Sequence, residues 1–65
     1  MNFIEKYLRD SRLSQSELAR RLGVSQPTVS DWIAGNKTPS GDKVLALARE
    51  MGIPVEKVLK QLYGE

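Results

Sequence analysis

Apolar residues return every three or four positions along most of the chain, a spacing typical of helices that bury one face. The inward side of a first predicted helix has this spacing: Phe3, Ile4, Tyr7, Leu8 and Ser11. Asn2 is placed to cap this helix, with Glu5 three residues later. We expect Phe3 and Tyr7 in the core rather than as stacking platforms for bases, because such platforms occur mostly on exposed sheets and grooves.

Two short helices joined by a tight turn are predicted in the middle of the chain. Ser14 is a typical N-cap, and Glu17, three residues on, is placed to return the hydrogen bond. Leu13, before the cap, can pack against Leu18 as a hydrophobic staple. Gly23 follows the last apolar position, where a left-handed residue without Cβ ends a helix easily.

The helical pattern restarts two residues after that glycine. Ser25 is a second N-cap, and Val24 and Val29 can form a second staple. The predicted helix covers 26–34, and a further glycine ends it. Two helices with a short connection that contains glycine are what a helix-turn-helix requires, so we predict this motif over about 14–35.

Helical spacing continues through the second half of the chain. A loop at 35–41 is rich in Gly, Asn and Pro, and Ser40 within it is placed to cap a fourth helix. This helix carries an apolar stripe that a glycine stops: Val44, Leu45, Leu47, Ala48 and Met51. A fifth helix begins at Ile53-Pro54, and its inward positions are Val55, Val58, Leu59 and Leu62. Because the period is near 3.6 rather than 2, we predict an all-α, compact five-helix bundle without a β-hairpin.

Length and composition exclude several classes of function. The 65 residues allow one domain with one small core, expected to span 1–65. Without cysteine or histidine, the sequence cannot form disulfides, the common zinc-ligand sets or histidine-dependent catalytic groups. We therefore expect no enzyme, no metal or other cofactor, and no small-molecule ligand. No apolar run approaches the about 18–20 residues of a membrane span, so we expect a cytoplasmic protein.

Charge and polar residues point to the helix-turn-helix as the functional region. The net charge is only +2, but the first 37 residues carry six Lys or Arg against four Asp or Glu. This balance fits a few phosphate contacts, although many solvated helices look similar. The outward face of the predicted helix at 26–34 consists largely of short polar residues with poor helix propensity: Gln26, Pro27, Thr28, Ser30 and Asp31. We interpret this face as a reader of hydrogen-bonding edges; the alternative is a small polar face without a task.

The segment Q-S-E-L-A-R-R-L-G-V-S-Q-P-T-V-S-D-W-I-A-G-N-K-T-P resembles the DNA-binding core of the phage Cro and repressor helix-turn-helix family. The resemblance runs from about Arg12 through Pro39 and continues more loosely through K-V-L-A-L-A-R-E-M-G-I-P-V. It implies a lambda-repressor-like domain whose second motif helix enters the major groove of double-stranded DNA, while the first crosses the backbone. It also implies that the first helix of the chain braces the motif from behind.

The resemblance implies that the face of the 26–34 helix reads bases. Gln26 is the best candidate, since its amide matches the edge of adenine; otherwise it is only a first-turn residue. Pro27 offers an apolar contact to a thymine methyl group, or serves only to start the helix. Thr28 can reach a phosphate or a base, and Ser30 lies further along. Asp31 either accepts from the amino group of cytosine or pairs with a nearby arginine.

Phosphate contacts are expected on both sides of this face. Gln15 begins the first motif helix, where free N–H groups favour anions, and it matches a phosphate-binding glutamine of the family. Asn36, Lys37 and Thr38 follow the recognition helix and resemble the family's loop contact to the DNA backbone. Arg12 is a further candidate.

Four other residues of the motif have less direct predictions. Trp32 is expected in the core, with its indole N–H within reach of a phosphate. Ile33 is expected to be more exposed, at a position where the family usually has a polar residue. Arg20 and Arg21 are weaker candidates for phosphate contacts than Arg12, because each can lie on the solvated outer face.

One recognition helix covers only a few base pairs, so the resemblance implies a dimer on a pseudo-palindromic operator. The candidate dimer contacts are Ile53, Pro54, Val55 and Tyr63. With so little surface, the dimer is expected to be weak and to form mainly on DNA. The sequence carries no second domain for an inducer, which favours a Cro-like repressor of the bacterial cytoplasm and nucleoid. The alternatives are an antitoxin that neutralises a partner protein and autoregulates its promoter, and a protein-only interaction module.

Overall fold

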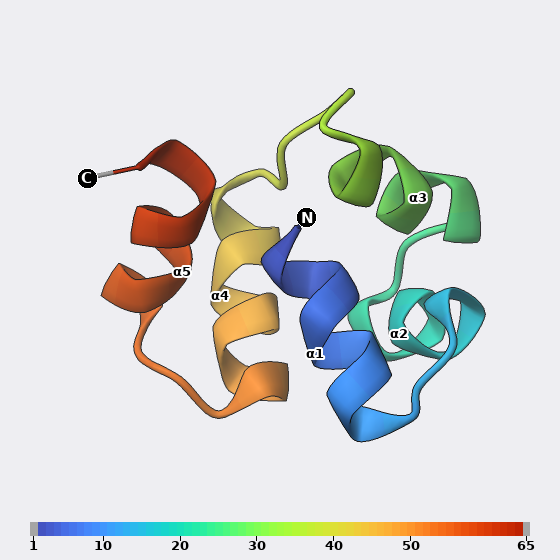
Figure 1. Ribbon diagram of the computed structural model, residues 1–65. Coiled ribbons are helices and arrows are strands. Elements are labelled where there is room, and N and C mark those ends of the chain that lie inside the picture. Colours follow the sequence, from blue (N-terminus) through green and yellow to red (C-terminus); the bar gives the residue numbers. More distant parts are fainter. Residues whose placement is uncertain (1, 65) are drawn as a thin grey trace.

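The computed structural model describes residues 2–64 and consists of helices joined by short connections (Figure 1). In chain order these are α1 (Phe3–Ser11), α2 (Gln15–Leu22), α3 (Gln26–Ala34), α4 (Gly41–Met51) and α5 (Val55–Tyr63). No strand occurs within residues 2–64, so the predicted all-α fold of five helices is confirmed. The longest of these helices has 11 residues, and none is long and apolar enough to cross a membrane.

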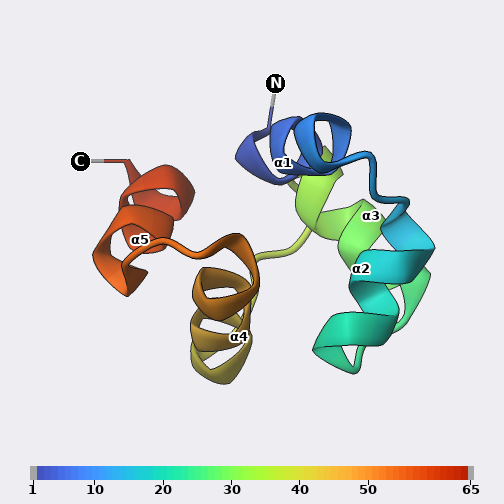
Figure 2. The ribbon, with the colours of Figure 1, turned by 90° about the horizontal axis from the view of Figure 1, so that it is seen from below.

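Helices α4 and α5 lie on the opposite side of the molecule from α2 and α3 in both views (Figures 1 and 2). The buried side chains form two clusters. The larger one joins the first three helices to α4 and consists of Ile4, Leu8, Leu18, Ala19, Leu22, Val29, Trp32 and Leu47. The smaller one joins α4 to α5 and consists of Val44, Ala48 and Val58. Since α4 contributes buried residues to both clusters, and Phe3 of α1 packs against both, these two helices connect α5 to the helix-turn-helix.

Local signals in the sequence begin and end the motif helices as predicted. The Ser14 hydroxyl accepts from the N–H of Glu17 at 3.0 Å, and the Ser25 hydroxyl accepts from the N–H of Thr28 at 3.3 Å. Gly23 ends α2 with a φ of 71°, in the left-handed region where glycine has no steric cost. The predicted bounds of both motif helices are therefore confirmed.

Two predicted capping interactions are wrong. The Glu17 carboxylate does not return a hydrogen bond to the backbone at Ser14, because in the described chain it accepts from Arg20 and Arg21 instead. Ser40 stands at the N-cap of α4 but makes no capping bond with its side chain. Its hydroxyl donates to Asp42 Oδ1 at 2.7 Å, and this bond lowers the pKa of the Asp42 carboxyl.

Two leucines expected to point inward are exposed. Leu45 is 52% exposed and Leu59 is 40% exposed, whereas their neighbours Val44 and Val58 are buried. Each leucine is one residue, or about 100°, around its helix from that valine. Helix α5 packs mainly on α4, so only a narrow stripe of it is covered. The predicted apolar stripes are therefore wider than the surface that the neighbouring helices bury.

An ion-pair network ties α2 to α4. The Glu17 carboxylate accepts from Arg20 and from Nε of Arg21, the latter at 3.1 Å. Nη1 of Arg21 lies 2.5 Å from the Glu50 carboxylate. These hydrogen bonds, from Arg20 first, lower the pKa of Glu17, and the bonds to Glu50 and then Glu17 raise the pKa of Arg21. Tyr7 donates to the backbone carbonyl of Glu50 at 3.1 Å. Both arginines are exposed as expected, and Arg21 also bridges two helices.

Two side chains hold the C-terminal ends of the motif helices. Asn2 caps α1 by accepting from the N–H of Ile4 at 2.7 Å, and its amide nitrogen donates to the carbonyl of Trp32 at 2.9 Å. Lys43 of α4 donates to the carbonyl of Leu22 at 3.3 Å. The last carbonyls of a helix lack partners within it, and Lys43 satisfies that of Leu22. The Trp32 carbonyl accepts from Asn2 in addition to the N–H of Gly35 at 3.3 Å. The expected bracing of the motif by α1 is thus present, through Asn2 as well as the core.

Leu47 and Leu45 allow a matched test of the packing, because both lie on α4 and differ in burial. Leu47 is fully buried, so Leu47→Ala should lower the free energy of unfolding by about 2–5 kcal/mol. Leu45→Ala should change it by no more than about 0.5 kcal/mol. Urea unfolding followed by circular dichroism measures both. Equal losses in the two variants would show that α4 does not present this face to the core.

Candidate nucleic-acid interface

The turn between α2 and α3 consists of Gly23, Val24 and Ser25. Gly23 and Val24 donate backbone hydrogen bonds to the last turn of α2, the latter to Ala19 at 2.9 Å. The Val24 side chain packs against the larger buried cluster. Because the turn is hydrogen-bonded and partly buried, it fixes the direction in which α3 leaves α2.

One side of α3 faces the core and the other faces solvent. Val29 and Trp32 are buried, which confirms the prediction for both residues. Ile33 is half-buried against the same cluster rather than standing clear of it. The five candidate base-reading residues lie on the rest of the helix, where Gln26, Pro27 and Ser30 are exposed and Thr28 and Asp31 are partly exposed.

The hydrogen-bonding capacity of Gln26 and Ser30 is unused within residues 2–64. Neither side chain has a partner there, and both residues are exposed. Thr28 differs, since its hydroxyl lies 2.8 Å from the Ser25 hydroxyl and is thereby held toward the cap of α3. Gln26 therefore offers a free donor and a free acceptor in the N-terminal turn of α3.

Asp31 faces a different neighbour from the one suggested by the sequence. Its carboxylate lies 3.8 Å from the Lys37 ammonium, not beside an arginine. The carbonyl of Asp31 also accepts from the N–H of Asn36 at 2.9 Å and from that of Lys37 at 3.4 Å. The structure therefore joins a candidate base-reading residue to a candidate phosphate-binding residue.

The candidate phosphate-binding residues lie just before the motif, at its start and just after it in the sequence. Gln15 is the first residue of α2 and is half-buried, while Asn36, Lys37 and Thr38 are exposed directly after α3. Arg12 is exposed and ends α1 with a φ of 58°, which is uncommon for a residue with a side chain. The sequence does not predict this left-handed residue, because only glycine gives a clear signal for a positive φ.

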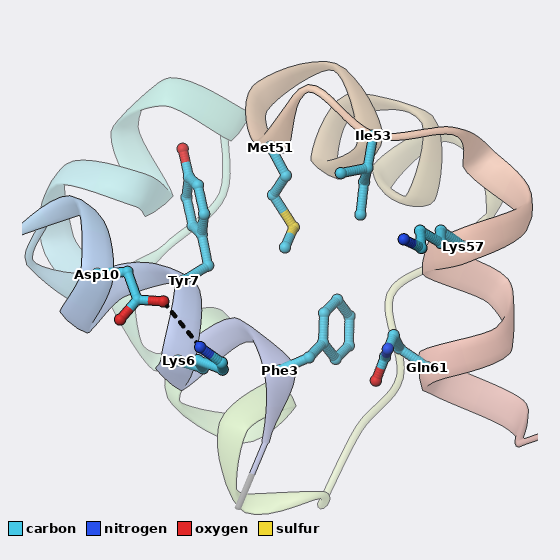
Figure 3. A pocket seen from close by; sticks show the side chains of 8 residues that line it. All are labelled: Phe3, Lys6, Tyr7, Asp10, Met51, Ile53, Lys57 and Gln61. Carbon is cyan, nitrogen blue, oxygen red and sulfur yellow. Dashed lines mark hydrogen bonds and ion pairs between the residues drawn. The ribbon is translucent and has the colours of Figure 1, made fainter.

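A hollow of about 290 Å³ lies between α1 and the chain from Met51 to Gln61 (Figure 3). Phe3 and Ile53 are among its apolar walls, and the ion pair of Lys6 with Asp10, at 3.0 Å, lies on its rim. None of the candidate DNA contacts lines it. The described residues hold no cluster of acidic side chains arranged for a metal ion.

The candidate dimer residues differ in how far they are exposed. Pro54 is exposed and Tyr63 is 66% exposed, whereas Ile53 and Val55 pack partly against the smaller cluster. Leu59 is also exposed on α5, although its helical spacing predicted an inward position.

Comparison with known proteins identifies the family. The model of the helix-turn-helix family HTH_3, a family of DNA-binding regulatory domains, matches residues 4–58. No curated protein and no solved structure matches the chain. The family match covers α1 to α4 and the first part of α5, and hence the turn, the exposed face of α3 and the loop after it. The chain therefore belongs to the helix-turn-helix family HTH_3.

Proposed function

We propose that this protein is a Cro-type transcriptional repressor that binds double-stranded DNA in a sequence-specific way. The observation that supports it most directly is the two-sided nature of α3: Val29 and Trp32 anchor it in the core, while Gln26 and Ser30 keep free polar groups in solvent. A major groove admits one helix and presents a distinct pattern of donors and acceptors for each base pair. An anchored helix with a free polar face suits that groove.

In this proposal the N-terminal turns of α3 enter the groove first. Gln26 reads adenine through its amide, and Pro27 contacts a thymine methyl group. The Thr28 hydroxyl is held 2.8 Å from the Ser25 hydroxyl. From this position Thr28 reaches a base or a phosphate. Ser30 lies further along the same exposed face.

Phosphate contacts hold the domain on the duplex. Gln15 stands at the N-terminus of α2, where backbone N–H groups and the helix dipole favour an anion. Lys37 and Thr38 are exposed in the loop after α3, and Asn36 beside them offers a polar side chain. Arg12 supplies a further cation next to the start of α2. Such contacts position the protein without reading sequence.

A second copy of the chain is proposed to occupy the other half-site of a pseudo-palindromic operator. The contacts would come from the end of the chain that includes Pro54, Val55 and Tyr63, with Ile53 partly withdrawn into the hollow. Leu59 adds apolar surface beside Tyr63. This exposed area is small, so the dimer forms mainly on DNA.

Repression then follows from occupation of the operator, which excludes the polymerase, and it is set by the concentration of the protein in the bacterial cytoplasm. The antitoxin alternative requires a surface for a partner protein. No observation on residues 2–64 singles out such a partner, so we retain the repressor as the proposal.

Selection from random-sequence duplexes followed by sequencing tests the proposed function. We expect an enriched site with two inverted half-sites about one helical turn, or 10 base pairs, apart. An enriched site without symmetry would reject the dimer, and no enrichment at any salt concentration would reject sequence-specific binding altogether.

Replacing Gln26 tests base reading. Gln26→Ala should weaken binding to the selected site by about 1–3 kcal/mol and relax the preference at one base pair of each half-site. Gln61→Ala is the matched control, because it removes an exposed glutamine that lies on α5 instead of α3. Dissociation constants from fluorescence anisotropy report the loss. If both variants bind and select as the parent does, Gln26 does not read the operator.

The weak dimer predicts a specific dependence on Tyr63. Sedimentation should find monomers of the free protein at low micromolar concentration, because α5 exposes little apolar surface. Tyr63→Ser should weaken binding to a duplex with two half-sites and leave binding to a single half-site unchanged. A stable dimer without DNA would contradict the first expectation, and an unaffected Tyr63→Ser variant would remove this surface from the dimer.

A further inference from the structure

We propose that Asp31 determines specificity by acting as a fixed counter-charge to Lys37. In this role its carboxylate weakens binding to non-cognate DNA more than binding to the operator. The inference rests on the proposed function, because it concerns the same DNA-facing surface. It assigns the one acidic residue among the proposed contacts to discrimination rather than to affinity.

The proximity of Asp31 and Lys37 is built into the backbone. The Asp31 carbonyl accepts from Asn36 at 2.9 Å and from Lys37 at 3.4 Å, so the loop after α3 folds back on Asp31. Lys37 therefore starts from a fixed place beside Asp31, and its ammonium lies 3.8 Å from the carboxylate. The Asp31 side chain is 34% exposed, which leaves it accessible to a ligand as well as to the lysine.

The position of Asp31 is unfavourable for a residue without a task. It opens the last turn of α3, where the negative end of the helix dipole disfavours a carboxylate. No other residue of α3 carries a charge, so the helix that is proposed to enter a polyanion has a net negative charge. Lys37 is the neighbour that offsets it, and this pairing takes Lys37 partly away from phosphate.

The two classes of DNA respond differently to this pair. Non-specific binding depends almost entirely on neutralised phosphates, so a carboxylate that shares Lys37 weakens it directly. On the operator a cytosine amino group can donate to the same carboxylate, which offsets the repulsion and releases Lys37 to the backbone. The ratio of operator affinity to non-specific affinity therefore rises, while the overall affinity for DNA falls. The cognate half-site then contains a cytosine opposite Asp31.

The experiment measures dissociation constants of Asp31→Asn for the selected operator and for a random-sequence duplex of equal length, over a series of salt concentrations. The isosteric amide removes the charge and keeps the shape. Binding to the random duplex should tighten by roughly fivefold, the size of one charge interaction at about 4 Å in water. The slope of log binding constant against log salt concentration for the random duplex should steepen by about one unit, because Lys37 is freed to neutralise a phosphate. Binding to the operator should not tighten.

Further variants isolate the pair from general charge effects. Asp31→Ala should reproduce the result, and in a Lys37→Gln background the effect of Asp31→Asn on the salt slope should disappear. Asp10→Asn is the control, because Asp10 also pairs with a lysine but lies on α1. It should change both affinities by the same small factor. Site selection with Asp31→Ala, which also removes the acceptor oxygens, should lose a cytosine preference at one position of each half-site.

The outcomes separate this inference from the proposed function. If the parent protein prefers the operator and Asp31→Asn changes both duplexes by the same factor, the inference is overturned and the repressor proposal stands. Retention of the cytosine preference in Asp31→Ala would likewise overturn it. If the parent protein shows no preference for any selected duplex, the proposed function fails first.

Discussion

The structure depends on the burial of one side of α3. A helix of nine residues is too short to be stable alone, so it takes its stability from packing. Val29 and Trp32 provide that packing against α1 and α2, and Asn2 holds the carbonyl of Trp32 from α1. Once these contacts fix the rotation of α3, the side chains on its opposite face point outward, including the free amide of Gln26. The same packing contacts therefore stabilise α3 and hold its polar side chains in solvent.

Features that depend on neighbouring residues along the chain could be predicted from the sequence. The caps at Ser14 and Ser25 and the left-handed Gly23 act within one turn, so their residue types are sufficient signals. The inward position of Trp32 follows from helical spacing. For the same reason, the exposed face of α3 was predictable as a set of residues.

Features that depend on distant partners could not be predicted in this way. Leu45 and Leu59 fit the apolar period but lie beyond the surface that other helices cover. Arg21 pairs with Glu50 on α4 only because the fold brings α2 and α4 together. Spacing shows which face a residue occupies, but not which charged group stands opposite it. The pairing of Asp31 with a lysine of the following loop was missed for this reason.

The candidate interface therefore combines a rigid support with a few free polar groups. The most direct measurement is the change in backbone amide chemical shifts when a selected operator duplex is added. The largest changes should occur at residues 26–31 and 36–38, with residues 4–8 of α1 affected little. Unchanged shifts at 26–31, with changes concentrated on another surface, would contradict the role of α3 in binding DNA.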